Sequence, residues 1–403
     1  MANLELMRRL QDPNETKIVL LILDGLGGLS EESGGPTELE AATKPNMDRL
    51  AKEGTLGQII PVRRGITPGS GPAHLALFGY DPVEHEVGRG VLEVTGIGMQ
   101  VESGDVAARG NFCTVDENGK ITDRRAGRLS TEEARPLVEK LQSIELEGVS
   151  AEVRVLREYR VGLVLRGEDL HPNIADTDPL EVGEKPLTAE PLDEKSERAA
   201  KYVNQWVEEA RRILSDQPKA NALTLRGFST NPRLPQIQDI YGLDPACIAV
   251  YPMYRGVSAL VGMKVIQFEG EDPTDEFSAL AREWDNHNYF FVHIKKPDSL
   301  GEDGAFHKKA DYIGKVDKAL DQILELEPDV LAITGDHSTP SRIRYHSWHP
   351  VPLLVWAPAT AREDDQSTFG ETNCTHGGLG TFPSSELMPI LMAHARRIKK
   401  FGA

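Results

Sequence analysis

The residues of this chain that could do chemistry are acidic residues, histidines and a serine that follow apolar segments. One apolar run, residues 330–334, ends directly in Gly335-Asp336-His337. Such a run predicts a buried strand that delivers a carboxylate and an imidazole to the carboxyl edge of a sheet. Oxygen and nitrogen ligands of this kind suit a divalent cation. An aspartate that caps the next turn and a surface histidine would give the same local pattern, so this segment does not decide the question by itself.

Other segments end in the same kinds of residue. The apolar run Ile18–Leu23 is followed by Asp24, and the run at 289–294 is followed by Asp298 and then Glu302. The full set of candidate ligands, drawn from separate segments, is Asp24, Ser70, Asp298, Glu302, Asp336, His337 and His346. Hard-metal ligand types at so many strand ends are unlikely to coincide by chance. We therefore predict a site for two divalent cations with a serine between them.

Ser70 lies between two glycines, in Gly69-Ser70-Gly71-Pro72. The proline is typical of a helix start, and a hydroxyl there would face unsatisfied N–H groups that attract anions. A Gly/Pro/Ser loop without chemistry has the same sequence. The significance of Ser70 therefore depends on the ligand candidates elsewhere in the chain.

A second group of residues is basic. Arg109, Arg124, Arg125 and Arg128 fall close together in a chain whose formal net charge is −18. Solvated strand faces would explain them, but arginine forks also match carboxylate and phosphate groups. We predict an anion-recognition patch in this part of the chain.

The elements that must position these residues follow an α/β rhythm. A length of 403 residues favours two domains. All-apolar strands indicate a parallel sheet with helices on both faces. We expect this sheet domain to be discontinuous, made of residues 1–99 and 244–403, with an α/β substrate-binding domain inserted at 100–243. Within the insert, Ser130 and Glu133 have the spacing of a helix-capping box, and 167–194 is expected to be a long loop.

Composition excludes several classes of function. The net charge of −18 repels nucleic acid, and the longest early apolar run, of six residues, is too short to span a membrane. Cys113, Cys247 and Cys374 are widely spaced, which predicts reduced packing residues and a cytoplasmic protein. Neither GxGxxG nor a Walker motif occurs, so a nucleotide-binding fold is disfavoured. The sequence does not predict an oligomeric state.

The motifs together resemble those of a known family. The sequence resembles the alkaline phosphatase superfamily and, more narrowly, archaeal-type 2,3-bisphosphoglycerate-independent phosphoglycerate mutases. The motifs that carry this resemblance in the sheet domain are Leu23-Asp24-Gly25-Leu26-Gly27-Gly28, Pro68-Gly69-Ser70-Gly71-Pro72-Ala73-His74, Pro297-Asp298-Ser299-Leu300-Gly301, Thr334-Gly335-Asp336-His337-Ser338-Thr339-Pro340, His346-Ser347 with Pro350-Val351-Pro352, and the tail Gly377-Gly378-Leu379-Gly380. Those in the insert are Ala108-Arg109-Gly110-Asn111-Phe112, Asp123-Arg124-Arg125-Ala126-Gly127-Arg128, Asp176-Thr177-Asp178-Pro179 and Leu225-Arg226-Gly227.

This resemblance implies a role for each matching residue. Ser70 would be the nucleophile and become phosphoserine during interconversion of 3-phosphoglycerate and 2-phosphoglycerate. Two cations, Mn²⁺ or Mg²⁺, would be bound. The first would be held by Asp24, Ser70, Asp336 and His337, and the second by Asp298, Glu302 and His346. The reaction would not need 2,3-bisphosphoglycerate. The implied substrate-binding residues are Arg109, Asn111, Asp123, Arg124, Arg128 and Arg226, with Arg255 near the transferring phosphoryl group.

One position departs from the family pattern. Better-known members place a histidine where this chain has Glu302, and the adjacent Asp303 is an alternative ligand. Two other functions share the same ligands: a metal-dependent phosphohydrolase and a mutase of another small phosphate, such as a sugar phosphate. A non-enzymatic homologue is disfavoured because Ser70 and most of the ligand set are present.

Overall fold

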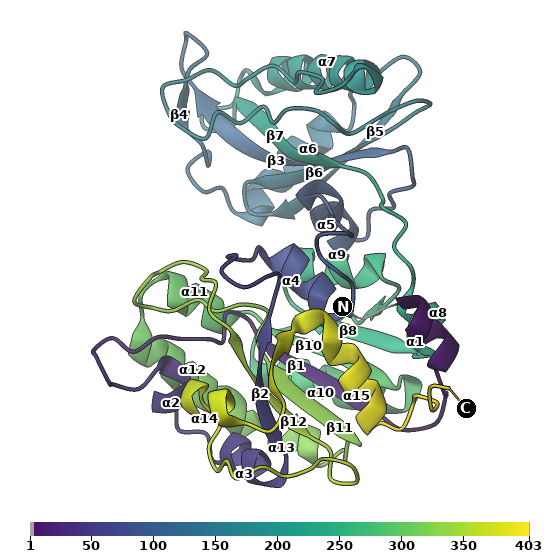
Figure 1. Cartoon of the computed structure of the whole chain (residues 1–403). Coiled ribbons are helices and arrows are strands. Elements are labelled where there is room, and N and C mark those ends of the chain that lie inside the picture. Colours follow the sequence, from purple (N-terminus) through teal and green to yellow (C-terminus); the bar gives the residue numbers. More distant parts are fainter. Residues whose placement is uncertain (1–3, 403) are drawn as a thin grey trace. The chain divides into compact units, whose positions relative to one another are not determined.

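The computed structural model describes residues 4–402, which form two compact units. The main unit comprises residues 1–86 and 234–403, and the inserted unit comprises 87–233 (Figure 1). The insert was predicted from the sequence at 100–243. The structure groups helix α5 (Arg89–Gly96) with the inserted unit because α5 packs on strands β3 (Val106–Val115) and β7 (Ala222–Ser229). That the inserted unit binds substrate stays a prediction.

The main unit holds an eight-stranded sheet. Its strands are β1 Ile18–Leu23, β2 Thr55–Ile60, β8 Pro245–Ala249, β9 Lys264–Val265, β10 Tyr289–Ile294, β11 Val330–Thr334, β12 Val351–Trp356 and β13 Gly380–Pro383. Its α-helices are α1 Leu4–Leu10, α2 Glu38–Ala41, α3 Pro45–Glu53, α4 Ser70–Leu77, α8 Ile237–Tyr241, α9 Pro252–Leu260, α10 Pro273–Glu283, α11 Lys296–Glu302, α12 Phe306–Ala319, α13 Asp321–Leu324, α14 Glu371–His376 and α15 Leu387–His394. Short 3₁₀ turns are η2 Trp284–Asn286 and η3 Ser384–Glu386.

The strand order of the main sheet is β13-β2-β12-β11-β1-β10-β8-β9. Its centre is parallel, since β1 pairs in parallel with both β10 and β11, and β10 with β8. The predicted α/β fold with a parallel sheet is therefore confirmed. Strand β12 is the exception and runs antiparallel to β11 and β2. It follows β11 through a loop without a helical crossover, and a parallel partner would need such a crossover.

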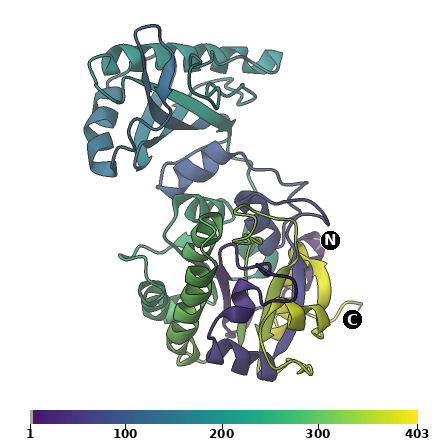
Figure 2. The same cartoon turned by 90° about the vertical axis from the view of Figure 1, so that its left-hand side faces the viewer.

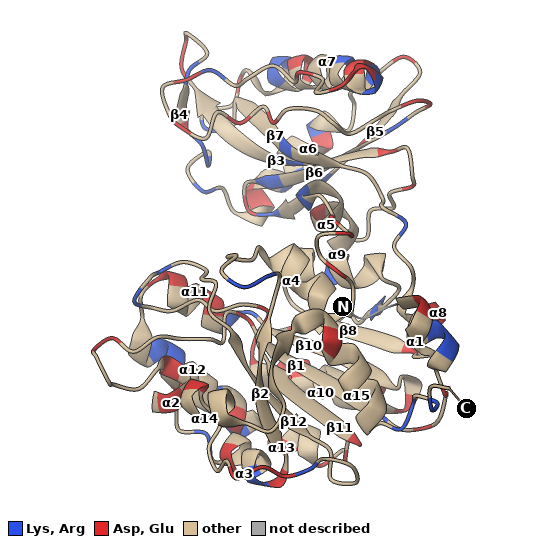
Figure 3. Cartoon of the chain, viewed as in Figure 1, with Lys and Arg blue, Asp and Glu red and all other residues tan. Residues whose placement is uncertain are grey.

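The central strands are buried on both faces. Every residue of β1, β10 and β11 is buried, and these strands carry no Lys, Arg, Asp or Glu along their length (Figure 3). Side chains alternate along a strand, so Val19 and Leu21 share one face and pack with α3, α10 and α12. Figure 2 shows the layers: the green helices lie on one side of this sheet and the yellow α15 on the other. Both faces of the strands are therefore covered, as the apolar runs predicted.

The inserted unit is built on an antiparallel five-stranded sheet. Its strand order is β4-β3-β6-β5, and β7 also pairs with β3, along the edge of β3 opposite β6. The elements not yet given are β4 Ile121–Asp123, β5 Ser150–Arg157, β6 Arg160–Arg166, α6 Thr131–Leu141, η1 Glu194–Ser196 and α7 Glu197–Leu214. Helix α6 begins at the predicted capping box of Ser130 and Glu133. No helix or strand occurs between β6 and η1, as expected for the long loop at 167–194.

Two further sequence interpretations can be compared with the structure. The three cysteines are free and buried, which agrees with their interpretation as packing residues. Among residues 4–402, none of the helices combines the length and the apolar character that a membrane span requires.

Candidate metal centre

Three neighbouring strand ends bring most of the predicted ligands together. Asp24 follows β1, Asp336 and His337 follow β11, and Asp298 lies in α11 just after β10. Because these parallel strands are adjacent, their carboxyl ends share one edge of the sheet. Nε2 of His337 lies 3.3 Å from Oδ1 of Asp24 and 3.3 Å from Oδ2 of Asp336. Nε2 of His346 lies 3.7 Å from Oδ1 of Asp298. The carboxylates and His337 are all buried.

Hydrogen bonds on the far side of two imidazole rings fix their tautomers. Thr339 Oγ1 donates its single proton to Oδ1 of Asp298 at 2.7 Å, so it accepts from Nδ1 of His337 at 3.0 Å. The carbonyl of Pro68 can only accept, at 3.0 Å, from Nδ1 of His346. Each Nε2 therefore carries a lone pair, and both lone pairs face the carboxylates. This is the arrangement by which proteins orient metal-ligating histidines.

The atoms that face one another here lack partners. Among the residues that the structure describes, Oδ1 of Asp24, Oδ2 of Asp336 and Nε2 of His337 are buried without a hydrogen bond. Buried acceptors left facing one another are costly unless a cation lies between them. Two overlapping groups have ligand spacing: Asp24, Asp336 and His337, and Asp298, His337 and His346. The donor set fits divalent cations held by oxygen and imidazole nitrogen.

The protonation of the site agrees with cation binding. Burial lowers the pKa of His337 well below its ordinary value, so its ring is neutral and able to coordinate. Burial and the charges of Asp24 and Asp298 raise the pKa of Asp336 well above its ordinary value. A cation at this point would take the place of a proton that the crowded carboxylates otherwise share.

Ser70 opens helix α4, as its Gly/Pro surroundings predicted. Its carbonyl accepts a hydrogen bond from Nδ1 of His74 at 2.7 Å, and His74 Nδ1 also lies 3.5 Å from Oδ2 of Asp336. His346 holds the same loop from the other side through the carbonyl of Pro68. The segment that carries the serine is thus joined to both groups of candidate ligands.

Glu302 is the predicted ligand that the structure does not bring into either group. It is exposed at the end of α11, and none of the ion-binding groups among the described residues includes it. Partial burial and then the charge of Asp298 raise its pKa, although Lys295 and His346 act in the opposite direction. It therefore lies within electrostatic reach of the site. The adjacent Asp303 is also exposed, and the role of either residue as a ligand stays a prediction.

Lys295 is a site residue that the sequence analysis missed. Its Nζ donates to Oδ2 of Asp24 at 2.9 Å and to Oδ2 of Asp298 at 2.5 Å. Burial opposes its charge, but the two carboxylates raise its pKa overall, so the ammonium stays protonated. In the sequence it is one of two consecutive lysines in a turn, a pattern typical of solvated residues, and no local signal distinguishes it.

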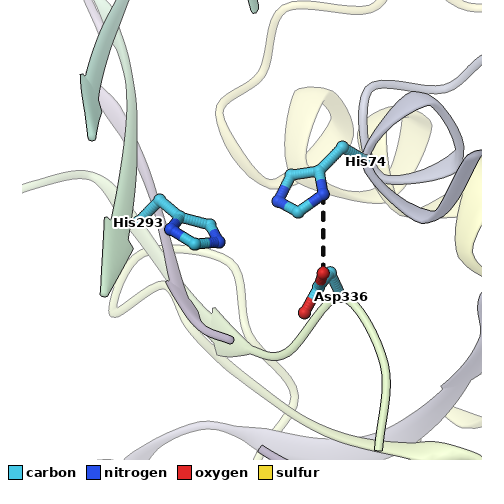
Figure 4. Close-up of side chains that lie close together, drawn as sticks. All are labelled: His74, His293 and Asp336. Carbon is cyan, nitrogen blue, oxygen red and sulfur yellow. Dashed lines mark ion pairs between the residues drawn. The ribbon is translucent and has the colours of Figure 1, made fainter. Parts of the chain in front are cut away.

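Two histidines were also missed, His74 and His293, which form a third group of ligand spacing with Asp336 (Figure 4). Nε2 of His74 and both ring nitrogens of His293 have no hydrogen-bond partner in residues 4–402. Burial lowers the pKa of His74 to about 4 and that of His293 well below its ordinary value. Tyr254 stacks on His293 and donates to Oδ2 of Asp24 at 2.5 Å. The sequence contains a signal for each of them. His293 lies within an apolar strand, and His74 lies one helical turn after Ser70.

The predicted substrate residues of the insert are partly brought together. Arg109 on β3 pairs with Arg226 on β7, so these two residues share a face of the sheet with Asn111. Arg109 donates to Glu93 at 3.1 Å. Arg124 donates to Asp178 at 3.0 Å, and Arg226 lies 3.9 Å from the same carboxylate.

The other predicted substrate residues are Asp123, Arg128 and Arg255. Asp123 accepts the backbone N–H groups of Arg125 and Gly127, at 2.8 and 2.6 Å, and so shapes the turn that presents the arginines. Arg128 is exposed in that turn with a φ of 55°. Arg255 belongs to the main unit, where it donates to the side chain of Gln267.

This fold and site define a class: an α/β protein whose sheet edge presents carboxylates and imidazoles, at the spacing of metal ligands, beside a helix-opening serine. Residues 51–220 match the family model of 2,3-bisphosphoglycerate-independent phosphoglycerate mutase. The chain is 49% identical, over 98% of both chains, to a protein of Thermus thermophilus named as a probable member of that family. It is 47% identical to one from Aquifex aeolicus, over 99% of this chain and 100% of the relative.

Solved structures agree with the sequence relatives. A protein from Pyrococcus horikoshii is similar with a TM-score of 0.83 and 30% identity, over 97% of this chain and all of the other. A cofactor-independent phosphoglycerate mutase from Thermoplasma acidophilum is similar with a TM-score of 0.70 and 30% identity, over 94% of this chain and 100% of the other. The chain belongs to the 2,3-bisphosphoglycerate-independent phosphoglycerate mutase family.

Proposed function

We propose that this enzyme interconverts 3-phosphoglycerate and 2-phosphoglycerate through a phosphoserine formed on Ser70. The observation that carries the proposal is the convergence of Asp24, Asp298, Asp336 and His337 on one sheet edge beside the helix that Ser70 opens. Membership of the family supports the choice of substrate. A role in glycolysis and gluconeogenesis, and a cytoplasmic location, follow from the same proposal.

Two cations would be held here. Asp24, Asp336, His337 and the Ser70 hydroxyl are the proposed ligands of one, and Asp298 and His346 of the other, which Glu302 would complete. When bound, Mn²⁺ or Mg²⁺ would favour the ionised form of the serine and offset charge on the phosphoryl oxygens.

The charge of the site supports two cations and not three. With cations bound, the proposed ligands Asp24, Asp298, Asp336 and Glu302 would carry one negative charge each, and Lys295 carries one positive charge, which leaves three negative charges. Two divalent cations would bring the sum to one positive charge, which a phosphoryl dianion can balance. A third divalent cation, at His74 and His293, would leave three positive charges in a largely buried site, which is costly.

The chain's own residues would carry the transfer. Oγ of Ser70 loses its proton and attacks phosphorus, and the Oγ–P bond forms. The bond from phosphorus to the substrate oxygen breaks, and that oxygen takes up a proton, which leaves glycerate and phosphoserine. Backbone N–H groups at the start of α4 can donate to the phosphoryl oxygens. The other hydroxyl of glycerate then attacks phosphoserine, and Ser70 regains its free hydroxyl.

Retention of glycerate separates a mutase from a phosphatase. We propose that Arg109, Arg226 and Asn111, which share one sheet face, bind the carboxylate and phosphate of the substrate. Arg124 is proposed to join them, because it contacts the same carboxylate of Asp178 as Arg226 does. Arg128 and Arg255 are proposed as further contacts, and Asp123 as the residue that shapes the arginine turn.

One assay tests the reaction. The enzyme is supplied with 3-phosphoglycerate and Mn²⁺ or Mg²⁺ without 2,3-bisphosphoglycerate, and both 2-phosphoglycerate and free phosphate are followed. We expect 2-phosphoglycerate to form with little free phosphate. Free phosphate without 2-phosphoglycerate would show a phosphohydrolase, and no reaction until a sugar phosphate is supplied would show a mutase of another substrate.

A variant tests the nucleophile. Ser70→Ala should abolish turnover while the enzyme still binds cations through the remaining ligands, and Ser299→Ala on α11 serves as the control. When turnover of substrate labelled in its phosphoryl group is quenched with acid, the wild-type enzyme should keep the label. The Ser70→Ala variant should keep none. Mutase activity retained by Ser70→Ala would contradict the phosphoserine route.

A further inference from the structure

A buried lysine hydrogen-bonds to the backbone next to the candidate metal ligands and to none of the ligand side chains. Lys309, on α12, is fully buried. Its Nζ donates to the carbonyls of Gly25 at 2.8 Å, Thr339 at 2.9 Å and Gly27 at 3.3 Å. An ammonium has three protons, so the backbone satisfies it completely. These carbonyls come from two loops, one after β1 and one after β11.

The same two loops carry the ligands. Gly25 directly follows Asp24, and Thr339 comes two residues after His337. The N–H of Thr339 is shared between the carbonyls of Gly25 and Gly27, at 3.2 and 3.0 Å, and the N–H of Gly25 donates to Oδ1 of Asp336 at 3.2 Å. The loops therefore lie side by side, and the lysine joins them through their backbone carbonyls.

A buried glutamate, Glu38, accepts hydrogen bonds from the same two loops, two residues after the carbonyls that Lys309 contacts. Oε1 of Glu38 accepts the N–H of Ser341 at 2.6 Å, and Oε2 accepts the N–H of Leu29 at 3.1 Å. Glu38 is itself fully buried, and its Oε1 lies 4.0 Å from Nζ of Lys309. The pair thus contacts the loop after β1 at three points and the loop after β11 at two, and it balances its own charge inside the protein.

The two loops are closely packed against each other and against α11. A methyl group added at Gly27 would meet Oγ of Ser338 at 1.9 Å, and one added at Gly301 would meet the carbonyl of Thr339 at 2.2 Å. In so close a packing, a small shift of either loop changes the separation of Asp24 from Asp336 and His337. Ligand separation in turn governs cation affinity.

We propose that Lys309 and Glu38 form a positioning pair that sets the spacing of the Asp24 loop and the Asp336–His337 loop and thereby the cation affinity of the site. The pair contacts neither cation nor substrate. This role goes beyond the proposed reaction, because it concerns assembly of the ligand set and holds equally for a mutase or a phosphohydrolase.

The test compares two variants that separate loop positioning from charge burial. Lys309→Met leaves Glu38 charged and unpaired, so we expect a lower melting temperature and weaker Mn²⁺ binding. In Lys309→Met/Glu38→Gln the buried charge is gone, and we expect the melting temperature to recover towards that of the wild type. Its Mn²⁺ affinity should remain about 10- to 100-fold weaker, the usual cost of losing support behind metal ligands. Calorimetric titration of the folded protein with Mn²⁺ measures this affinity without any substrate.

Two further variants complete the experiment. Glu38→Gln is the mildest change and should fold in any case, with Mn²⁺ affinity weakened by about tenfold. Lys315→Met, on the exposed side of the same helix, removes an ion pair with Asp272 and should leave Mn²⁺ affinity unchanged. If Glu38→Gln and the double variant bind Mn²⁺ as tightly as the wild type does, the pair serves stability alone and the proposal is wrong.

Discussion

The ammonium of Lys295 lies 2.9 Å from Oδ2 of Asp24, while Oδ1 of that carboxylate has no hydrogen-bond partner in the described part of the chain. The two oxygens of Asp24 therefore have different tasks. One is neutralised by a cation that belongs to the chain, and the other faces Nε2 of His337 and is free to coordinate. Because Lys295 also bridges to Asp298, one fixed positive charge is shared between the two proposed metal positions.

Removal of that charge should strengthen cation binding and weaken turnover. In Lys295→Met the site becomes more negative by one charge. Like charges about 4 Å apart repel by about 1 kcal/mol even at the dielectric constant of water, so Mn²⁺ should bind about fivefold tighter or more. The rate constant kcat should fall because less positive charge faces the phosphoryl group. Titration with Mn²⁺ and steady-state kinetics measure both effects; Lys296→Met is the neighbouring control. Weaker Mn²⁺ binding in Lys295→Met would show that the lysine supports the ligands and does not compete with cations.

Glu302 can be tested by restoring the residue that better-known members of the family carry. If Glu302 completes the second cation position, Glu302→His should keep activity and shift the metal preference from Mg²⁺ towards Mn²⁺ and Co²⁺, because imidazole is a softer ligand than carboxylate. Activity profiles over these three metals give the readout, with Asp303→His as the matched control. A profile that changes only in Asp303→His would assign the ligand to Asp303. Unchanged profiles in both variants would show that neither side chain binds the cation.

Much of the site could be predicted because strand ends are local in sequence. The apolar run Ile18–Leu23 coincides with β1, and the residue after it is a ligand candidate in space as well. Parallel pairing then places Asp24 beside Asp336 and His337 with no further information. The antiparallel direction of β12 was not predicted, since an apolar run does not reveal its pairing partner.

The missed residues depend on distant contacts. Lys295 and Lys309 look like ordinary solvated lysines in a turn and on a helix. Lys295 is partly buried against Asp24 and Asp298, and Lys309 is buried only when the loops after β1 and β11 close over it. His293 differs in that its sequence context was informative, because an imidazole inside an apolar strand needs a partner. What the sequence could not supply was the distance from His293 to His74 and Asp336.

The count of bound cations tests the charge argument. We expect two equivalents of Mn²⁺ per chain at saturation, measured by elemental analysis after removal of free metal. In His293→Leu the count should stay at two, because His293 belongs to the third ligand group, which stays without a cation when the other two are filled. A count of three in the wild type that falls to two in His293→Leu would show that His74, His293 and Asp336 hold a cation of their own. His287→Leu, which lies just after η2 and before the start of β10, is the control for loss of a buried imidazole.

Stability should depend on pH through a glutamate far from the active site. Glu276, on α10, is almost fully buried, and burial followed by the charges of Asp275, Asp272 and Glu271 raises its pKa from an ordinary value of 4.5 to about 9. Between these values the folded protein holds a proton that the unfolded chain has lost, so the free energy of unfolding falls as pH rises from about 4.5 to about 9. Glu276→Gln removes this dependence. We expect the variant to be more stable than the wild type at pH 8 and similar at pH 5, as measured by urea unfolding at both values. Glu325→Gln, an exposed glutamate on the neighbouring segment, should leave the wild-type slope intact. If the stability of Glu276→Gln falls with pH as steeply as that of the wild type, the pH dependence belongs to another acid, of which the partly buried Glu371, with a pKa of about 7, is the next candidate.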